Sequence, residues 1–414
     1  MQPREESQGA PPPSVPLAVI AREWGRIGIT GFGGPPAHIA LLRRLCVQRN
    51  QWLTEAEFED GIAATSLLPG PASTQLAIFC GWRLAGPAGA IVAGTCFIVP
   101  GLIIILGLSV LFLAHSPPAW VTGAADGAGA SVPAIAVAAA VGLMPASWRR
   151  ARGATAARAR WIGYLLAGAV AANLAGEFLV AVLVGCGLVE WLVSRPRRGS
   201  GEVTDGPARG ADGQSRDCDR GKGPTALLVP MAVKAVMAGA LGSLAWVALK
   251  VGALSFGGGF VIIPLMQHDA VHTYHWMTTA QFLSAVALGQ VTPGPVVLTV
   301  GVVGYAAAGV GGFLLAVLLA FAPSFLMVLA GGRHFDAFRR SAAAQAFLQG
   351  AGPAAIGAIA GAAITLGLGL TQLWQVAVLV AAAVWLLVLR RGVVAAILGA
   401  AGIGIVVALA GGLS

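Results

Sequence analysis

The sequence predicts an all-α polytopic membrane protein made of two homologous repeats that insert with opposite topology. Three observations support this fold class: the composition, an internal duplication and the distribution of loop charges. Hydrophobic residues make up 57% of the chain and charged residues only 10%, against roughly 25% charged residues in soluble domains. Stretches without any Asp, Glu, Lys or Arg, such as 84–125 and 270–332, can each hold at least one spanning helix of about 20 residues.

The N-terminal stretch 1–16 is a polar, proline-rich tail without the features of a cleavable signal peptide, so the first apolar run is expected in the mature protein. The 26 Lys and Arg residues lie mostly in short loops between apolar runs, which is typical of membrane topology and not of nucleic-acid binding. The five cysteines show no metal-ligand spacing. The expected surroundings are a lipid bilayer, and we expect no metal, cofactor or nucleic acid.

An internal duplication becomes visible when the chain is laid over itself so that Phe32 falls on Phe256. Without a gap, this register aligns Phe32-Gly33-Gly34 with Phe256-Gly257-Gly258, Trp52 with Trp276, Phe58 with Phe282, and Pro69-Gly70-Pro71 with Pro293-Gly294-Pro295. Tryptophan, phenylalanine and Pro-Gly-Pro in one register are a strong match. The sequence therefore divides into a tail (1–16), a first repeat (17–194), a charged linker (195–223) and a second repeat (224–414).

Loop charges predict how the two repeats are oriented, because Lys and Arg concentrate on the cytoplasmic side of a membrane. In the first repeat, arginines crowd 43–49 and 149–160, whereas the matching stretches 267–275 and 368–373 contain no Lys or Arg. Conversely, the basic stretches 333–340 and 390–391 match bare first-repeat loops near 115–120 and 171–176. This complementary pattern predicts inverted repeats, an arrangement found in secondary transporters with a substrate site near the bilayer midplane, and it predicts a cytoplasmic linker.

Each repeat offers a glycine-broken first segment, a segment interrupted by Pro-Gly-Pro, two long apolar segments and a short terminal hairpin. Opposite charge bias at Arg43 and Ser116 requires an odd number of crossings between them. The segment Gly61 to Trp82 is therefore predicted to be re-entrant, so that it enters and leaves on one side. This prediction amounts to about five full spans and one re-entrant segment per repeat, or about ten spans in all.

The broken segments are the candidate substrate site, because irregular backbone is tolerated at membrane depth only where it faces protein or a water-filled cavity. Freed N–H groups at a half-helix N-terminus favour an anion. Arg26 lies two positions before Gly28 in the first broken segment, and Lys250 lies two positions before the aligned Gly252 in the second. In an apolar run such a basic residue is a functional candidate, with snorkelling to the interface as the alternative. The candidate residues are Arg26, Phe32, Gly33, Gly34, Pro69, Gly70, Pro71, Lys250, Phe256, Gly257, Gly258, Pro293, Gly294 and Pro295.

Other polar residues have simpler interpretations. Thr54 begins Thr-x-x-Glu, which predicts a capping box at a helix start, and Thr278 is predicted to cap the matching helix. The histidines at 268, 272 and 275 could bind zinc on a helix, but an exposed polar loop is favoured. Asp126 aligns with Gln349, so a proton-coupling carboxylate there would serve one repeat only. Ser66, Gln75, Gln290 and Thr299 flank the Pro-Gly-Pro turns, where they could bind an oxyanion or satisfy the broken backbone.

The chain resembles the chromate ion transporter family in three features: Phe-Gly-Gly at 32–34 and 256–258, Trp-x-Thr-x-x-x-Phe at 52–58 and 276–282, and the two Pro-Gly-Pro turns. The resemblance covers nearly the whole chain apart from the tail and linker. It implies a multi-pass protein of the bacterial inner membrane that exports chromate and confers chromate resistance. One departure is Pro35 in the first repeat where the second has Gly259, so the two glycine elements need not contribute equally.

Two classes of function stay open at the sequence level. A chromate exporter working by alternating access is favoured, and a sulfate or other tetrahedral oxyanion permease is the alternative within transport, because both dianions have similar size and shape. A membrane-embedded enzyme acting on a lipid is disfavoured, because the second repeat holds only Asp269 and Asp336 as acidic residues. Homodimer formation is left open.

Overall fold

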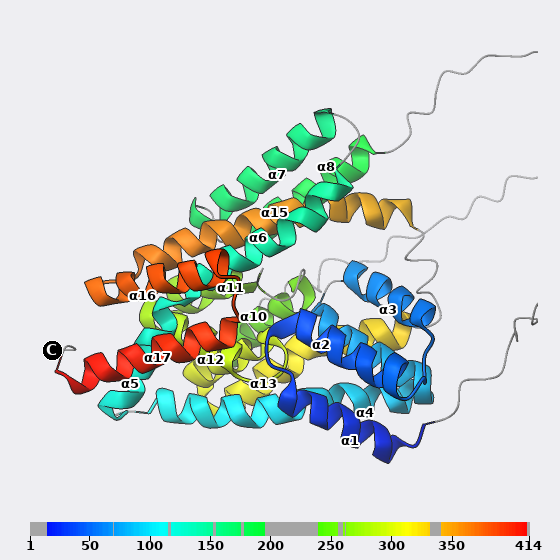
Figure 1. Cartoon of the computed structure of the whole chain (residues 1–414). Coiled ribbons are helices and arrows are strands. Elements are labelled where there is room, and N and C mark those ends of the chain that lie inside the picture. The colour runs from blue at the N-terminus through cyan, green and yellow to red at the C-terminus, as the bar shows by residue number, and fades with distance from the viewer. Residues whose placement is uncertain are drawn as a thin grey trace, which may run out of the picture.

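The computed structural model describes residues 15–68, 70–114, 117–151, 155–174, 178–194, 239–255, 260, 262–331 and 341–411, and their regular secondary structure is helical (Figure 1). The first repeat contains α1 (Leu17–Thr30), α2 (Gly34–Arg43), η1 (Arg44–Arg49), α3 (Glu55–Leu67), α4 (Ala72–Phe112), α5 (Ala119–Ala130), α6 (Val132–Arg150), α7 (Thr155–Leu174) and α8 (Leu179–Val193). The second contains α10 (Ala240–Leu254), α11 (Ile262–Gln267), η4 (His268–Thr273), α12 (Thr279–Val291), η5 (Val296–Leu298), α13 (Thr299–Gly331), α15 (Ala342–Leu368), α16 (Leu373–Ala383), η6 (Val384–Val388) and α17 (Val393–Leu409).

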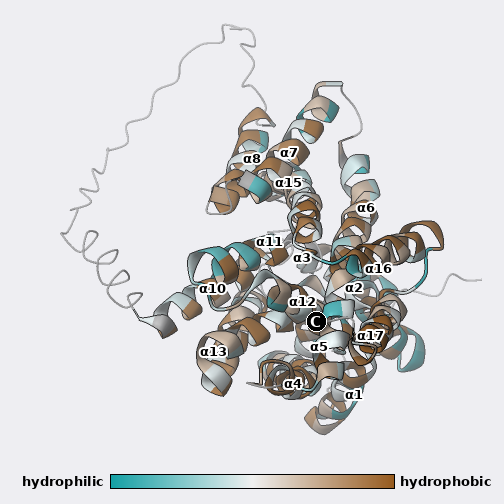
Figure 2. Ribbon diagram, turned by 90° about the vertical axis from the view of Figure 1, so that its left-hand side faces the viewer, coloured by the Kyte–Doolittle hydropathy of each residue, from teal (hydrophilic) through white to brown (hydrophobic). Residues whose placement is uncertain are grey.

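The outer surface is suited to a bilayer. Four helical stretches among the described residues are long and apolar enough to cross a membrane: Ala72–Phe112, Ala119–Arg149, Val296–Gly331 and Ala342–Leu368. Large aliphatic side chains face outward on these helices; Leu318 and Leu326 of α13, for example, are 68% and 66% exposed. Figure 2 shows hydrophobic residues along most of the helices. The described fold is therefore helical, as predicted, and is consistent with a polytopic membrane protein; the inverted orientation of the repeats and the number of spans stay predictions.

The two longest helices each contain the same sharp turn. In α4, Gly86 has φ 61° and ψ −151°, and in α13, Gly309 has φ 62° and ψ −151°. Glycine fits this positive-φ conformation because it has no Cβ. The chain reverses at each turn, since Gly81 lies against the backbone of Gly89 and Gly304 against that of Gly312. Thus α4 is an antiparallel pair of segments, 72–84 and 87–112, and α13 repeats the design with 299–307 and 310–331.

The Pro-Gly-Pro segments fold back on themselves, which is the geometry expected of a re-entrant hairpin. A Cβ placed on Gly61 of α3 would lie 2.6 Å from the ring of Phe79 in the first segment of α4, so the two helices run side by side from the turn. The predicted capping boxes are confirmed. Thr54 receives a hydrogen bond from the Glu57 N–H and donates its own N–H to the Glu57 carboxylate at 2.9 Å, and Thr278 and Gln281 repeat the pattern.

The glycine-broken first segments also reverse direction, which corrects their interpretation as single crossings. Glu23 of α1 and Arg49 of η1 form an ion pair at 3.8 Å, although a continuous helix would place them about 39 Å apart. The reversal takes place at Gly33 and Gly34, whose φ values of 102° and 73° cannot continue α1. In the second repeat, Lys250 and Asp269 are paired across the corresponding break. The described part of each repeat therefore begins with two helical hairpins.

The open ends of the first two hairpins are held together on one side of the molecule. Arg43, at the end of α2, forms ion pairs with Glu55 and Glu59 at the start of α3. Arg83, near the end of the first segment of α4, pairs with Glu57. Both hairpins of the first repeat thus enter the apolar body from the same side.

The terminal hairpins are exchanged between the repeats. Helices α7 and α8 of the first repeat pack on α15 of the second, where Gly357 meets the Leu165 carbonyl and Gly350 meets the Cys186 carbonyl (Figure 1). Reciprocally, α17 packs on α5 of the first repeat, where Gly123 and Gly404 touch. Small residues allow the backbones to approach this closely. Because of this exchange, neither repeat packs as an independent unit.

Candidate functional site

The Pro-Gly-Pro turn of each repeat rests on the second segment of the long helix of the other repeat. A Cβ on Gly101 of α4 would collide with the carbonyl oxygen of Pro293, and one on Gly70 would lie 2.9 Å from the hydroxyl of Ser324 in α13. Gly101 and Ser324 occupy aligned positions in the register that superposes Gly86 on Gly309. The two turns are therefore seated reciprocally, where the repeats meet.

The turn of the second repeat also joins the glycine break of the first. The N–H of Gly294 donates to the carbonyl of Gly31 at 3.1 Å. The candidate turn 293–295 thus contacts Gly31, the residue directly before the candidate residues 32–34 of the other repeat. Pro71 and Pro295 are buried, whereas Phe32 is 46% exposed. The candidate residues Pro69, Phe256, Gly257 and Gly258 lie outside the described residues.

The buried His38, which was not among the residues singled out from the sequence, stabilises the contact between Gly31 and Gly294. His38 of α2 is fully buried, and its Nε2 lies 2.9 Å from the Gly31 carbonyl while its Nδ1 lies 3.3 Å from the Ser73 hydroxyl. A carbonyl can only accept, so Nε2–H donates and neutral Nδ1 is left to accept from Ser73. The ring also meets Phe97 edge-on at 5.0 Å. The sequence feature that could have identified His38 as a structural contact is its place in an apolar run, where the second repeat has Ile262.

Several buried polar side chains near the turns have no hydrogen-bond partner among the described residues. These atoms are Thr74 Oγ1, Ser255 Oγ, Gln290 Nε2 and Ser324 Oγ, and each residue is at most 9% exposed. Thr74 and Gln290 lie three positions from a Pro-Gly-Pro turn, Ser324 faces Gly70, and Ser255 ends α10 at the second glycine break. An unpaired buried polar group costs about 1–3 kcal/mol, so these donors favour a ligand that accepts hydrogen bonds.

The start of α2 offers fewer donors than the sequence suggested. Gly33 is the N-cap residue, and Pro35 and Pro36 follow within the first turn. Proline has no N–H, so this helix N-terminus lacks two of the groups that would bind an anion. The side chains of Thr74 and Ser324 are better placed donors, although neither was among the residues singled out from the sequence.

The two basic candidate residues, Arg26 and Lys250, lie in different surroundings. Arg26 is exposed on α1, opposite a buried face that includes Glu23 and Trp24. Lys250 is 15% exposed and forms an ion pair with Asp269 at 2.5 Å. Burial raises the pKa of the Asp269 carboxyl, and the hydrogen bond and charge of Lys250 act in the opposite direction. The sequence did not predict the ion pair of Lys250 with Asp269, because these two residues lie on either side of a glycine break.

His268 and His272 of the second repeat lie in the helical element η4, which corrects their prediction as part of a loop. His272 and His275 are exposed, and the rings of His268 and His272 are 6.1 Å apart. No group of three or more His, Cys, Asp or Glu side chains with metal-binding geometry occurs in the described part of the chain.

Comparison with known proteins identifies the family. The family model described as Chromate transporter matches residues 18–191 and again residues 242–405. The chain is 30% identical to a chromate transport protein of Cupriavidus metallidurans over 86% of its own length and 83% of the relative's. It is also 30% identical to a chromate transport protein of Pseudomonas aeruginosa, over 87% of this chain and 83% of that one.

A probable chromate transport protein of Synechococcus elongatus is 29% identical over 86% of each chain. No solved structure matches the chain. The double match of the family model agrees with the duplication seen in the sequence and in the turns at Gly86 and Gly309. The chain belongs to the chromate transporter family.

Proposed function

We propose that the protein carries chromate out of the cell across the bacterial inner membrane. Relatives covering most of the chain are named chromate transport proteins, and family membership favours a transporter over a membrane-embedded enzyme. The observation that carries the proposal is the set of unpaired donors beside the hairpin turns: Thr74, Ser255, Gln290 and Ser324. A tetrahedral dianion accepts hydrogen bonds on all its oxygens and would satisfy such donors.

Alternating access follows from the way the repeats meet. Each Pro-Gly-Pro turn is seated on a helix of the other repeat, so a rocking motion of one repeat against the other would change the access to both turns together. Proline and glycine fix the shape of the turns without filling them with side chains. The substrate site would then stay between the repeats while its opening changes sides, as in other inverted-repeat transporters.

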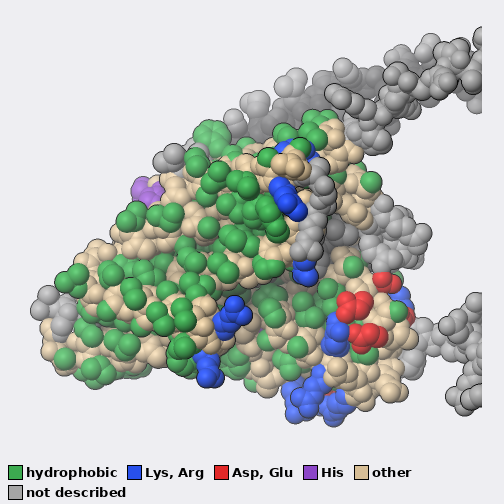
Figure 3. Space-filling model, turned by 45° about the horizontal axis from the view of Figure 1, so that its top comes forward, with side chains coloured by type: hydrophobic (Ala, Val, Ile, Leu, Met, Phe, Trp, Pro, Cys, Tyr) green, Lys and Arg blue, Asp and Glu red, His purple; other side chains and the backbone are tan. Residues whose placement is uncertain are grey.

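Loop charges support opposite orientation of the repeats. In Figure 3, Lys, Arg, Asp and Glu side chains lie toward the right and centre of the visible face, and the left end shows hydrophobic, other and His side chains. We take both hairpins of a repeat to return to their side of entry, and we therefore count crossings from the second segments of α4 (87–112) and α13 (310–331) onward. The total number of spans also depends on residues 195–238, which lie outside the described part.

A labelling experiment tests the orientation at aligned positions. Gln48 and His272 are aligned in the register that places Trp52 on Trp276, and both are exposed. We expect an impermeant thiol reagent added to whole cells to label His272→Cys but not Gln48→Cys, since the loop around Arg49 is basic and the loop around His272 is not. Equal labelling of the two variants, above that of the unmodified chain, would mean that the repeats are not inverted.

The direction of transport is proposed from electrostatics. A dianion leaving a cell at about 100 mV, negative inside, gains about 4.6 kcal/mol, twice the value for a single charge. Electrogenic export, or exchange for another anion, therefore needs no proton. Flux in vesicles that follows a pH gradient while the voltage is clamped would contradict this coupling. Sulfate is the alternative substrate, because the same donors suit either tetrahedral dianion.

The decisive experiment measures chromate and sulfate binding to the purified chain. In the double variant Thr74→Val/Ser324→Ala we expect chromate affinity to fall by roughly tenfold to a hundredfold, about 1–3 kcal/mol, because two donors are lost. Thr122→Val is the matched control, since Thr122 bonds only within its own helix. Unchanged affinity in the double variant would place the anion site elsewhere. Growth in chromate with and without the gene tests the function in cells.

A further inference from the structure

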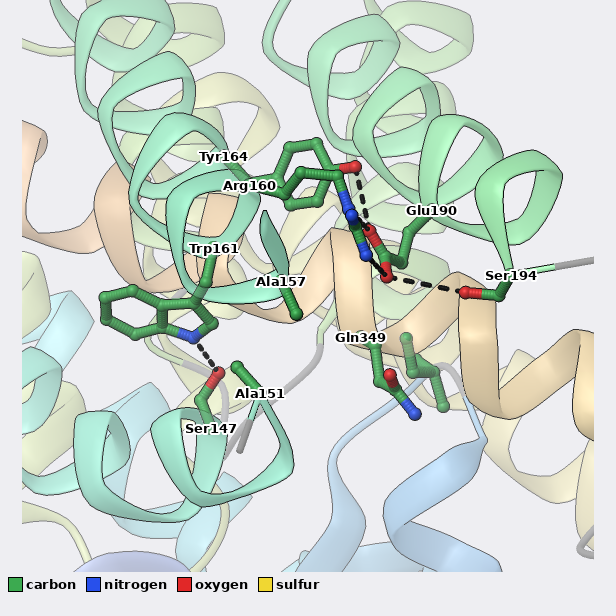
Figure 4. A pocket seen from close by; sticks show the side chains of 10 residues that line it. Ser147, Ala151, Ala157, Arg160, Trp161, Tyr164, Glu190, Ser194 and Gln349 are labelled. Atoms are coloured by element: carbon green, nitrogen blue, oxygen red, sulfur yellow. Dashed lines mark hydrogen bonds and ion pairs between the residues drawn. The ribbon is translucent and has the colours of Figure 1, made fainter. Parts of the chain in front are cut away.

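A second polar site lies apart from the hairpin turns. A partly open cavity of about 260 Å³ is lined by the end of α6, the start of α7 and the end of α8 of the first repeat and by α15 of the second (Figure 4). Its lining includes Arg160, Tyr164, Glu190 and Gln349, and no residue of the glycine breaks or Pro-Gly-Pro turns. Both repeats therefore contribute to a cavity that the transport proposal does not use.

The inner wall of the cavity is a fixed and electrically neutral network. Arg160 donates two hydrogen bonds to the Glu190 carboxylate, at 2.8 and 2.9 Å, and the Tyr164 hydroxyl donates a third at 3.0 Å. In Figure 4, Arg160, Tyr164 and Ser194 all point toward Glu190. Glu190 is only 7% exposed, and its carboxylate is already matched by one guanidinium. It therefore does not compensate any further positive charge nearby.

Further positive charge is present beside the cavity. Arg149 and Arg158 are exposed, and neither forms an ion pair with another described residue. The guanidinium of Arg158 lies over the ring of Trp148 at 5.9 Å, and Trp148 meets Trp161 edge-on at 4.9 Å. The indole of Trp161 lines the cavity and donates to Ser147 at 2.9 Å. A surplus of two positive charges thus adjoins a cavity with aromatic and hydroxyl groups.

The position of Arg158 on α7 places it and the neighbouring tryptophans, Trp148 and Trp161, at the membrane interface. Ile162, Leu166 and Val170 recur at every fourth position and are 47%, 56% and 55% exposed, so they form a lipid-facing stripe. Arg158 is the next position on that stripe toward the helix start. Tryptophan and arginine at the end of such a stripe are typical of the boundary between acyl chains and headgroups. The orientation predicted from the loop charges puts this boundary on the cytoplasmic side.

We propose that this cavity binds the phosphate group of an anionic phospholipid from the cytoplasmic leaflet. Basic pockets between helices on that side suit such headgroups, and each arginine near the surface contributes about 1 kcal/mol, or a factor of about five in affinity. A headgroup lying between α7–α8 and α15 contacts both repeats. It would therefore stabilise one relative position of the repeats.

The test measures lipid binding to the full-length chain in phosphatidylcholine nanodiscs with added phosphatidylglycerol, by native mass spectrometry. We expect Arg149→Gln/Arg158→Gln to bind phosphatidylglycerol about 25-fold more weakly, the product of two factors of about five. Ala157→Phe, which fills the cavity without changing charge, is expected to lose the binding as well. Arg391→Gln is the matched control, because Arg391 is exposed and does not line the cavity.

Three outcomes would overturn the proposal. Equal loss in Arg391→Gln would show a general surface-charge effect. Displacement of phosphatidylglycerol by inorganic phosphate or by chromate would show a site for a soluble oxyanion. Unchanged binding in the double variant would remove the basis in Arg149 and Arg158, whether or not Ala157→Phe folds. None of these readouts requires transport, so they are independent of the proposed function.

Discussion

The first hairpins of the two repeats have the same backbone plan but different chemistry. In the first repeat, the break is fastened by His38, and the hairpin ends are held by ion pairs of Arg43 and Arg83 with glutamates. In the second repeat, Ile262 aligns with His38 and cannot form the hydrogen bonds of the histidine. Both first hairpins have an ion pair across their helices, Glu23–Arg49 in the first repeat and Lys250–Asp269 in the second, but at positions that are not aligned. The histidine contact at the turn thus belongs to the first repeat, and the ion pairs lie at different positions in the two repeats.

This difference teaches that the duplication preserves turns more strictly than side chains. The turns at Gly86 and Gly309 agree closely in φ and ψ because only glycine relieves the strain of that conformation. Side chains around them have diverged, because several different arrangements of hydrogen bonds and ion pairs can stabilise the hairpins. Arg26 and Lys250 are aligned in sequence, yet Arg26 is exposed, whereas Lys250 is half-buried and paired with the buried carboxylate of Asp269.

The largest expected effect concerns the buried pair. Lys250→Leu leaves Asp269 as an uncompensated buried charge, and we expect it to destabilise the protein by about 3 kcal/mol. In the double variant Lys250→Leu/Asp269→Leu, most of the loss is expected to be recovered, because no charge stays buried. Thermal unfolding in nanodiscs measures both. Equal stability of single and double variants would mean that the pair does not form.

The next largest effect is expected at His38, which aligns with an isoleucine in the second repeat. His38→Leu leaves the Gly31 carbonyl and the Ser73 hydroxyl without their partner, so we expect a loss of about 2 kcal/mol of stability and weaker chromate binding. Ile262→Leu at the aligned position is the control, with an expected cost below about 1.5 kcal/mol. Thermal unfolding and chromate titration are the measurements. Unchanged stability and chromate affinity in His38→Leu would show that the contact at Gly31 does not need the hydrogen bonds of His38.

A smaller effect is expected at the glycine turn of the first repeat. Gly33→Ala places a Cβ on a residue with φ 102°, which we expect to cost about 1–2 kcal/mol. Gly142→Ala, in the interior of α6 where an added Cβ meets no atom within 4 Å, is expected to stabilise the protein by up to about 1 kcal/mol. Opposite signs in thermal unfolding would confirm that the turn requires glycine, and equal signs would contradict it.

The smallest effect is expected at the exposed cation. Arg26→Gln is expected to change stability by no more than about 0.5 kcal/mol, as is usual for a surface residue. We propose that Lys250 contributes more to holding the dianion, by exchanging Asp269 for substrate, so Lys250→Gln is expected to weaken chromate binding more than Arg26→Gln does. Titration of both variants decides this. A larger loss in Arg26→Gln would place the important cation on the first repeat.

Much of the fold was predictable because its signals are local. Composition identified the membrane class, and the capping boxes at Thr54 and Thr278 marked two helix starts, since a cap depends on residues three positions apart. The Pro-Gly-Pro turns were recognisable as breaks for the same reason. The repeated Phe-Gly-Gly and Trp-x-Thr-x-x-x-Phe patterns were enough to suggest the chromate transporter family.

Other features were decided only by the tertiary structure. The sequence showed that the chain breaks at Gly33 and Gly34, but it did not show whether the helix resumes its direction or turns back, because glycine permits both. The partner of Lys250, the contacts of His38 and the exchange of the terminal hairpins depend on which helix faces meet between segments that are distant in the sequence. Small residues such as Gly357 and Gly404 allow close approach, but they do not specify the partner, so only the packed molecule determines these pairings.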